Sequence, residues 1–261
     1  MAFKNLNIVF EDNDILVCIK PAGIATESAN IRNADMVSMV KSHLLASSTN
    51  GSLSINNSNN KSMGGAPYVG LIHRLDQPVS GILVFAKNPA VAASLSKQVQ
   101  TEDMQKHYTA VVEGDFQEAF SSVPGIECLS DGAILLTNYL LKDSKQNKAI
   151  IAKKGQKGAD GKPAREAKLI IENISYYEDT NISVLRIRLL TGRFHQIRAQ
   201  LAGTGHPIVG DSKYGSDMIL PDMDKKKFPD CFKDDLSGIA LYASELAFKH
   251  PFSGKYMKFT L

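Results

Sequence analysis

The chain of 261 residues contains no tryptophan and only three cysteines, and no apolar run reaches membrane-spanning length. Cys18, Cys128 and Cys231 lie far apart without a Cys-x-x-Cys pair, so neither a disulfide framework nor a zinc site is indicated. We expect buried free thiols. The first residues lack an apolar signal core, so we expect a cytoplasmic protein that does not associate with membranes.

Motifs for nucleotide cofactors and metal ions are missing as well. The segment Gly158-Ala-Asp-Gly161-Lys162 lacks the spacing of a phosphate loop and the hydroxyl residue that follows its lysine. No Gly-x-Gly-x-x-Gly follows a predicted strand. His195 and His206 are eleven residues apart without a supporting Cys, Asp or Glu pattern. The sequence therefore predicts chemistry without a cofactor or a metal.

Size and charge indicate one mildly basic domain. With 43% hydrophobic residues the chain can build a substantial core for one large domain or two closely packed lobes, and we expect a single domain over residues 1–261. The net charge is +3, but Lys142 to Lys168 holds nine basic and three acidic residues, a local balance of +6. This stretch either contacts phosphates or forms a solvated hairpin whose glycines mark a mobile tip.

The hydrophobic patterning predicts many strands with a few helices placed irregularly among them. This favours an α+β fold with a mixed, mainly antiparallel sheet over repeated βαβ units. Strands are expected over residues 8–10, 15–19, 81–86, 106–113, 133–141, 167–172, 182–190, 239–248 and 256–261. Helices are expected over 34–46, 89–100 and 194–202. Residues 47–61 have the composition of a flexible connector, and 221–235 that of a charged loop.

One aspartate stands in an unusual setting. Asp76 follows a His-Arg pair and precedes an apolar strand that begins near Gly81. A carboxylate between a cation and a buried strand can stay ionised while partly desolvated, which prepares it for nucleophilic or base chemistry. The alternative is a turn aspartate that bonds to nearby backbone. A second segment, from Leu190 to Leu201, lies more than a hundred residues downstream and contains the cationic partners that such a carboxylate needs.

Ordered blocks along the chain resemble one known family. The segments around Asp76 and from Leu190 to Leu201, with Lys106-His107-Tyr108-Thr109-Ala110 and Gly205 to Gly215, resemble the RluA-like pseudouridine synthases, which isomerise uridine in structured RNA. The resemblance runs from Lys20-Pro21-Ala22-Gly23 to Leu241 through Pro251. It implies a bisected mixed sheet, flanking helices and a central RNA-binding cleft. The small N-terminal RNA-binding module of many members is not expected, because strand patterning starts by residue 8.

The resemblance implies roles for particular side chains. Asp76 would act as the catalytic carboxylate, Arg198 as its ion-pair partner, and Tyr108 as the ring that packs against the detached uracil. Arg74 would fill the gap left by the flipped base or hold its phosphate, and His73 would either assist or pack locally.

Further RNA contacts are expected at the start of the helix that contains Arg198. The candidates are Arg193, His195 and Gln196, because helix amino termini favour phosphate. Alternatively, Arg193 caps local carbonyls and His195 is a satisfied core residue.

The expected function is the isomerisation of specific uridines in ribosomal or transfer RNA by a monomer without an obligatory protein partner. A non-catalytic RNA-binding or RNA-folding protein is one alternative, and it predicts that Asp76→Asn leaves activity intact. A hydrolase of N-glycosidic bonds is another, because it also uses a carboxylate at an anomeric carbon. Release of free uracil would indicate the hydrolase.

Overall fold

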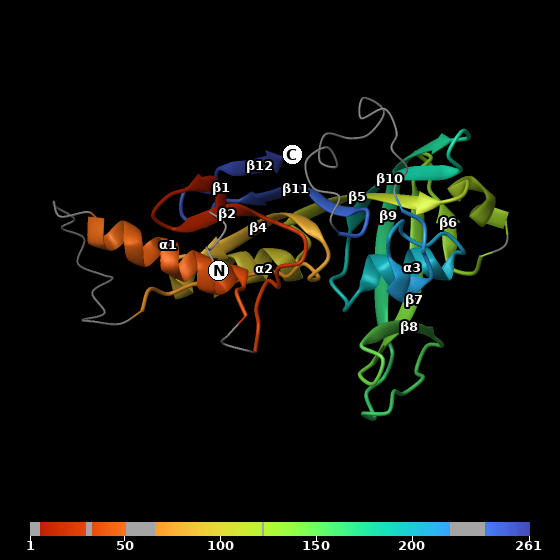
Figure 1. The fold of residues 1–261 in the computed structure, drawn as a ribbon, viewed down its shortest axis with the longest axis horizontal. Helices are drawn as coiled ribbons and strands as arrows, with labels where there is room; N and C mark the ends of the chain where they lie inside the picture. Colours follow the sequence, from red (N-terminus) through yellow and green to blue (C-terminus); the bar gives the residue numbers. More distant parts are fainter. Residues whose placement is uncertain (1–5, 30–32, 51–65, 122, 220–237) are drawn as a thin grey trace. The chain divides into compact units, whose positions relative to one another are not determined.

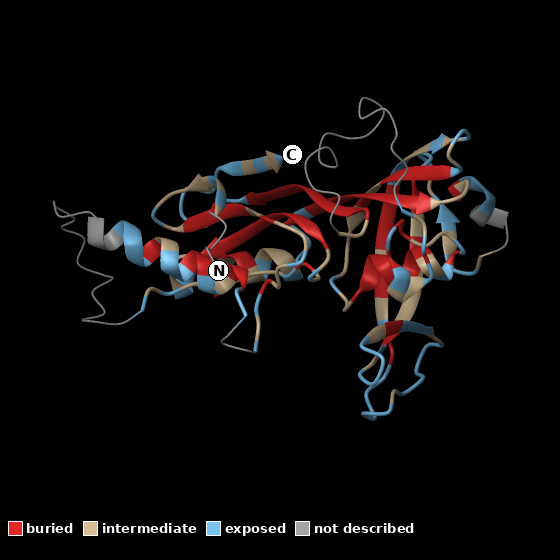
Figure 2. Cartoon of the chain, in the orientation of Figure 1, coloured by how far each residue is buried: buried red, intermediate tan, exposed pale blue. Residues whose placement is uncertain are grey.

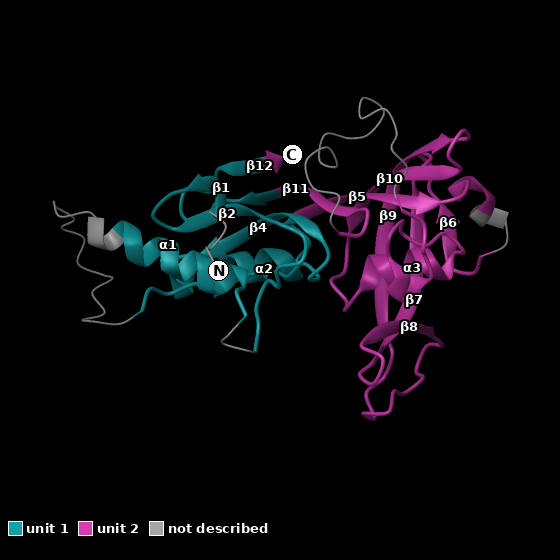
Figure 3. Ribbon diagram, viewed as in Figure 1, with its two compact units in different colours: residues 1–104, 247–258 teal, residues 105–246, 259–261 magenta. Residues whose placement is uncertain are grey.

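A computed structural model describes residues 6–29, 33–50, 66–121, 123–219 and 238–261. These residues form twelve strands and three α-helices (Figure 1), and the expected α+β fold is confirmed. The chain divides into two compact units (Figure 3). Unit 1 comprises Met1–Met104 and Ala247–Lys258, and unit 2 comprises Gln105–Leu246 and Phe259–Leu261. The single domain expected from the sequence stays a prediction.

Unit 1 is built on a small antiparallel sheet. Strand β2 (Ile15–Lys20) pairs on one side with β1 (Asn7–Glu11) and on the other with β4 (Ser80–Ala86), and the short β3 (Gly70–Leu71) also pairs with β4. Every residue of β4 is buried, as the apolar run predicted (Figure 2). The strand therefore forms the centre of the core of this unit.

Two helices complete unit 1. Helix α2 (Pro89–Gln100) begins where expected, because the Asn88 side chain accepts from the Val91 N–H and a proline occupies the first turn. Helix α1 (Met36–Asn50) extends four residues beyond the predicted end, so the prediction that a connector starts at residue 47 was wrong. The Ser47 hydroxyl donates to the carbonyl four residues earlier, which lets a serine continue the helix. The rest of that connector, and the expected loop at 221–235, lie outside the described residues.

Unit 2 contains a larger antiparallel sheet. Its order is β5 (Gln105–Glu113), β10 (Ile182–Leu189), β9 (Arg165–Tyr177), β7 (Ile134–Asp143) and β6 (Ile126–Cys128), with β8 (Lys148–Ala152) on β7. Strand β9 is longer than predicted because it pairs with β10 on one side and β7 on the other. Strands β6 and β8 were not predicted.

Helix α3 (Gln196–Gly203) packs against β7 and β8. A buried cluster joins these elements and consists of Leu140, Ala149, Ala167 and Ala199, with Phe194 and Tyr214 packed against it. The approach of helix and strand is close, since a Cβ at Gly203 would collide with the side chain of Ile151. The last strands, β11 (Leu241–Lys249) and β12 (Tyr256–Thr260), agree with the expected ones.

The cysteines only partly follow expectation. Cys18 on β2 is a buried free thiol, and burial raises its pKa to about 12. Cys128 on β6 is also free but is exposed, so the expectation of burial was wrong there because β6 is a short strand at the end of its sheet. Cys231 lies outside the described residues. Among the helices that the structure describes, none has the length and apolar character needed to cross a membrane.

Candidate functional site

Asp76 lies in the loop between β3 and β4, and hydrogen bonds anchor this loop on both sides of the aspartate. Before it, the Thr26 hydroxyl donates to the Leu75 carbonyl at 2.8 Å and accepts from the Leu75 N–H at 3.1 Å. After it, the Gln77 carbonyl accepts from the Gly23 N–H at 2.8 Å, and the Gln77 amide donates to the Gly23 carbonyl at 2.9 Å. Asp76 is half-buried. A fixed backbone therefore presents its carboxylate.

Lys20, at the end of β2, ties the neighbouring turn to the same loop. Its side chain is fully buried, and its ammonium donates to the carbonyls of Pro21 at 2.9 Å, Ile24 at 2.7 Å and Gln77 at 3.0 Å. Three carbonyl oxygens match the three donors of an ammonium. These bonds connect the turn Lys20-Pro21-Ala22-Gly23 to the loop of an aspartate more than fifty residues downstream.

Two further predicted residues lie on the same loop. Arg74 is exposed and His73 is half-buried. The exposed guanidinium of Arg74, two residues before Asp76, can contact a large ligand such as a polynucleotide. The role of Arg74 in RNA binding stays a prediction.

Tyr108 lies on β5 of unit 2 and is 6% exposed. Its register partner is Ile187 on β10, so the ring stands on the same sheet face as that apolar side chain. The two residues before it, Lys106 and His107, are also buried. The sheet therefore holds the tyrosine rigidly.

Gln196 organises the start of α3. Its side-chain oxygen accepts from the Arg193 N–H at 3.0 Å and the Thr191 hydroxyl at 2.8 Å, and its nitrogen donates to the Lys168 carbonyl at 3.0 Å and to Gln200 at 2.9 Å. These four bonds use the full capacity of the amide. Gln196 therefore positions the loop before the helix, and its predicted contact with RNA stays a prediction.

Arg193 and His195 precede Gln196 in the chain. The Arg193 Nε donates to the Glu166 carbonyl at 2.8 Å, as in the capping alternative. His195 is buried, its ring stacks on Phe194 with centroids 3.8 Å apart, and its Nδ1 lies 3.0 Å from the Tyr214 hydroxyl. Burial, with the nearby positive charge of an arginine, lowers the pKa of His195 to about 3. The ring is therefore neutral at physiological pH, which favours the core-residue alternative.

Arg198 is held by a buried, two-point ion pair. Its Nε donates to one oxygen of Asp211 at 2.7 Å and its Nη2 donates to the other at 2.8 Å. The exposed fractions are 4% for Arg198 and 1% for Asp211. The guanidinium carbon also lies 5.0 Å from the ring centroid of Tyr214. One edge of the guanidinium is thus fixed in direction, which is what a charged group needs to act at a defined point.

Sequence reasoning did not identify Asp211. The residue stands in a Gly-Asp turn, where an aspartate usually bonds to local backbone. Its backbone does form that turn, because its carbonyl accepts from the N–H groups of Tyr214 and Ser216 at 2.9 and 3.1 Å. Its side chain reaches a different element. The one available signal was its place in the block from Gly205 to Gly215.

The predicted catalytic residues are divided between the units. Asp76 belongs to unit 1, whereas Tyr108 and Arg198 belong to unit 2. Arg193, His195 and Arg198 are near one another in the sequence, around the start of α3 in unit 2. The ion pair between Asp76 and Arg198 stays a prediction.

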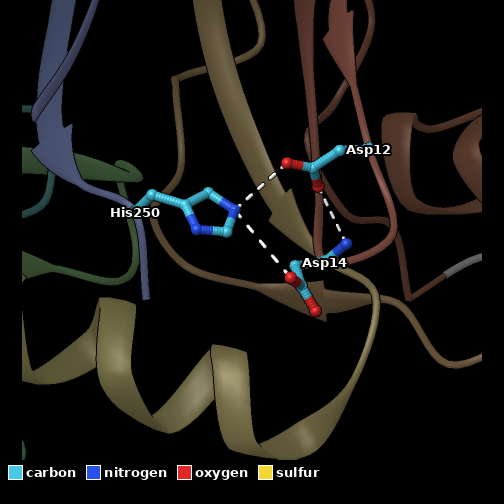
Figure 4. Close-up of side chains that lie close together, drawn as sticks. All are labelled: Asp12, Asp14 and His250. Carbon is cyan, nitrogen blue, oxygen red and sulfur yellow. Dashed lines mark hydrogen bonds and ion pairs between the residues drawn. The ribbon is translucent and has the colours of Figure 1, made fainter. Parts of the chain in front are cut away.

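One cluster of possible metal ligands occurs among the residues that the structure describes, formed by Asp12, Asp14 and His250 in unit 1 (Figure 4). The Ser253 N–H donates to His250 Nδ1 at 3.2 Å, so the proton of the neutral ring is on Nε2. That nitrogen lies 3.1 Å from an Asp12 oxygen and 3.9 Å from an Asp14 oxygen. The other Asp12 oxygen accepts from the backbone at Ile15. Hydrogen bonding that anchors the β1–β2 turn accounts for the cluster.

Comparison with known sequences gives consistent matches. Residues 14–203 match the family described as RNA pseudouridylate synthase. Ribosomal large subunit pseudouridine synthase D of Zymomonas mobilis is 30% identical over an alignment of 262 positions. This alignment covers 97% of this chain and 68% of that protein. Ribosomal large subunit pseudouridine synthase C of Haemophilus influenzae is 28% identical, with 98% and 67% covered. An uncharacterized RNA pseudouridine synthase of Aquifex aeolicus is 27% identical, with 98% and 69% covered.

Solved structures give the same picture of the fold. Human RNA pseudouridylate synthase domain containing 4 superposes with a TM-score of 0.64 at 18% identity, covering 98% of this chain and 87% of that one. Human RNA pseudouridylate synthase domain containing 1 gives a TM-score of 0.61 at 20% identity, with 98% and 83% covered. The segment matched to the family contains Asp76, Tyr108 and Arg198 and ends before Asp211.

Proposed function

The chain belongs to the RNA pseudouridylate synthase family, and from this membership we propose that it isomerises specific uridines in ribosomal or transfer RNA with Asp76 as the catalytic carboxylate. The observation that carries the assignment is the Asp76 loop, which hydrogen bonds fix on both sides while the aspartate itself stays half-buried. A fixed carboxylate that is still accessible suits chemistry on a nucleotide turned out of its helix.

The reaction explains the need for a carboxylate. Uridine loses the bond from ribose C1′ to uracil N1, gains a bond from C1′ to C5, loses the C5 proton and gains a proton on N1. C1′ therefore becomes electron-poor during the reaction. Asp76 attacks the sugar, stabilises its cationic character or removes a ribose proton, and each of these routes requires the ionised carboxylate.

We assign Arg198 as the ion-pair partner of the Asp76 carboxylate. Its Nε and Nη2 donate to Asp211, and we assign its Nη1 to Asp76. A guanidinium is suited to this double task because its donors point in fixed, separate directions. Asp211 then acts as a positioning residue, since it touches Arg198 rather than the substrate.

The remaining assignments concern the base and the RNA. Tyr108 would pack its ring against the detached uracil, and Arg74, which is exposed, would contact the RNA where the base has left its stack. Arg193, with His73, would add contacts at the edge of the site. For His195 and Gln196 the hydrogen bonds within unit 2 favour positioning of α3.

The proposal requires no oxidant, reductant or energy donor, because an isomerisation balances without one. It describes a cytoplasmic monomer that recognises structured RNA without an obligatory protein partner. Ribosomal RNA is the first candidate substrate, since several relatives are named ribosomal large subunit pseudouridine synthases.

Mapping pseudouridine in total RNA tests the function and identifies the target. Cells that lack the gene are expected to lose pseudouridine at one or a few positions, and the wild-type gene is expected to restore it there. An unchanged map in ribosomal and transfer RNA would contradict the proposal. Free uracil released from RNA by the purified protein would instead indicate a hydrolase.

A further inference from the structure

Tyr214 connects three parts of unit 2 through one side chain. It is the last residue of the short 3₁₀ helix η2 (Ser212–Tyr214). Its hydroxyl accepts from the Ala149 N–H on β8 at 2.7 Å and lies 3.0 Å from Nδ1 of His195. The guanidinium carbon of Arg198 lies over its ring, 5.0 Å from the centroid. A strand, the residue before α3 and the arginine assigned to the active site therefore meet at this tyrosine.

His195 has a backbone conformation that its surroundings must hold in place. Its φ of 48° and ψ of 31° lie in the left-handed region, which residues with a Cβ seldom occupy. It is the N-cap residue of α3, yet its side chain makes no capping hydrogen bond. The ring instead stacks on Phe194 and meets the ring of Tyr214 edge-on, with centroids 5.8 Å apart and planes at 74°. The unusual backbone thus directs the imidazole toward Tyr214.

The hydrogen bonds of the tyrosine favour one tautomer of His195. A hydroxyl that accepts from a backbone N–H still has one proton to donate, and Nδ1 can accept it when the proton of the neutral imidazole is on Nε2. The charged groups near the ring are those of Arg198, Lys213 and Lys142, which are positive, and of Asp211, which is negative. Burial and the excess of positive charge disfavour a second proton on the ring.

We propose that Tyr214 is a positioning residue for the isomerisation, whose hydroxyl holds His195 as the neutral Nε2–H tautomer and whose ring holds the guanidinium of Arg198. The inference rests on the proposed function for the role of Arg198. Asp211 fixes one edge of the guanidinium, and the ring of Tyr214 adds a second contact from a different side chain. A neutral His195 adds no positive charge that would repel the guanidinium. Tyr214 therefore acts through its neighbours and not on the substrate.

The variant Tyr214→Phe tests the role of the hydroxyl, because it keeps the ring and removes both hydrogen bonds. The substrate is a transcript that spans the mapped uridine, and the temperature is one at which circular dichroism shows both proteins fully folded. The single-turnover rate at saturating RNA is expected to fall about tenfold, since the ring under the guanidinium is no longer fixed. The affinity for the transcript should stay within about twofold of wild type. A residue that only stabilises the fold would change neither quantity at that temperature.

Tyr176→Phe is the matched control. The Tyr176 hydroxyl donates to the side-chain oxygen of Asn181 at 3.1 Å, so the variant loses the same atom and a hydrogen bond from the same unit. Its rate and affinity are expected to stay within about twofold of wild type. Equal losses of rate in the two variants, or a rate above half of wild type in Tyr214→Phe, would overturn the inference.

Nuclear magnetic resonance of protein with ¹⁵N-labelled histidine measures the tautomer without any turnover. His195→Asn identifies the signal, because asparagine tolerates the left-handed backbone. Near neutral pH the wild-type ring should have a bare Nδ1 and a protonated Nε2, and the Nδ1 resonance should move in Tyr214→Phe. A ring protonated on Nδ1 in the wild-type protein would overturn the inference. A wild-type protein that forms no pseudouridine in any RNA would instead reject the proposed function, whereas an active wild type with an equally active Tyr214→Phe would reject only the role of Tyr214.

Discussion

Asp76→Asn is expected to lower the single-turnover rate of pseudouridine formation by at least about 10³-fold, because the amide cannot attack the sugar, balance its positive charge or accept a proton. The affinity for RNA should stay within about threefold of wild type, since the aspartate is half-buried and contributes little to binding the backbone. Tritium release from RNA labelled at uridine C5 measures the rate, and filter binding measures the affinity.

Asp103→Asn provides a control in the same unit. Asp103 is an exposed carboxylate that accepts from the Thr101 hydroxyl at 2.6 Å. Its replacement by asparagine changes the net charge of the protein by the same amount as Asp76→Asn. It should leave both rate and affinity unchanged. If Asp76→Asn retained a tenth or more of the wild-type rate, Asp76 would not be the catalytic carboxylate.

The second large effect is expected at Asp211. With exposed fractions of 1% and 4%, Asp211 and Arg198 form a buried pair, and Asp211→Asn removes the negative charge that holds Nε and Nη2 of the guanidinium. Breaking such a pair costs about 3–5 kcal/mol of unfolding free energy. We expect a loss near the lower end of that range, because asparagine keeps one acceptor. The rate at saturating RNA should also fall by about 10²-fold, since Arg198 is no longer held in one direction. Urea unfolding and single-turnover kinetics measure the two effects.

A double variant separates the positioning role from simple stabilisation. Arg198→Met with Asp211→Leu replaces the pair by apolar side chains of similar size, and such replacements are often neutral or stabilising. The double variant should therefore be more stable than Asp211→Asn and still be inactive. Recovery of activity together with stability would mean that the pair only stabilises unit 2 and that Arg198 takes no part in the reaction.

The sequence predicted the parts of the site that depend on local patterns. The apolar strand after Asp76 and the helix that contains Arg198 both lie close to where the sequence pattern predicted them. It did not predict the bonds from Lys20 and Thr26 to the Asp76 loop, which join residues about fifty positions apart. Such contacts depend on how strands pair, and neither periodicity nor spacing encodes them.

Misleading composition accounts for two of the differences in the fold. The serine-rich segment that starts at Ser47 indicated a connector, yet the Ser47 hydroxyl donates to the carbonyl one turn earlier and the helix continues. Strand β8 was hidden because Lys148 to Ala152 stands within a run of lysines. Its pairing with β7 and the packing of Ile151 against Gly203 outweigh that composition.

The central claim is that the carboxylate of Asp76 and the guanidinium of Arg198 meet at the reacting ribose. A crystal structure of the enzyme bound to target RNA with 5-fluorouridine at the mapped position tests this directly, because fluorine cannot leave as the C5 proton does. We predict an Asp76 oxygen within about 3 Å of Arg198 Nη1 and beside ribose C1′. A separation of more than about 6 Å between the two groups, with the nucleotide bound, would contradict the account.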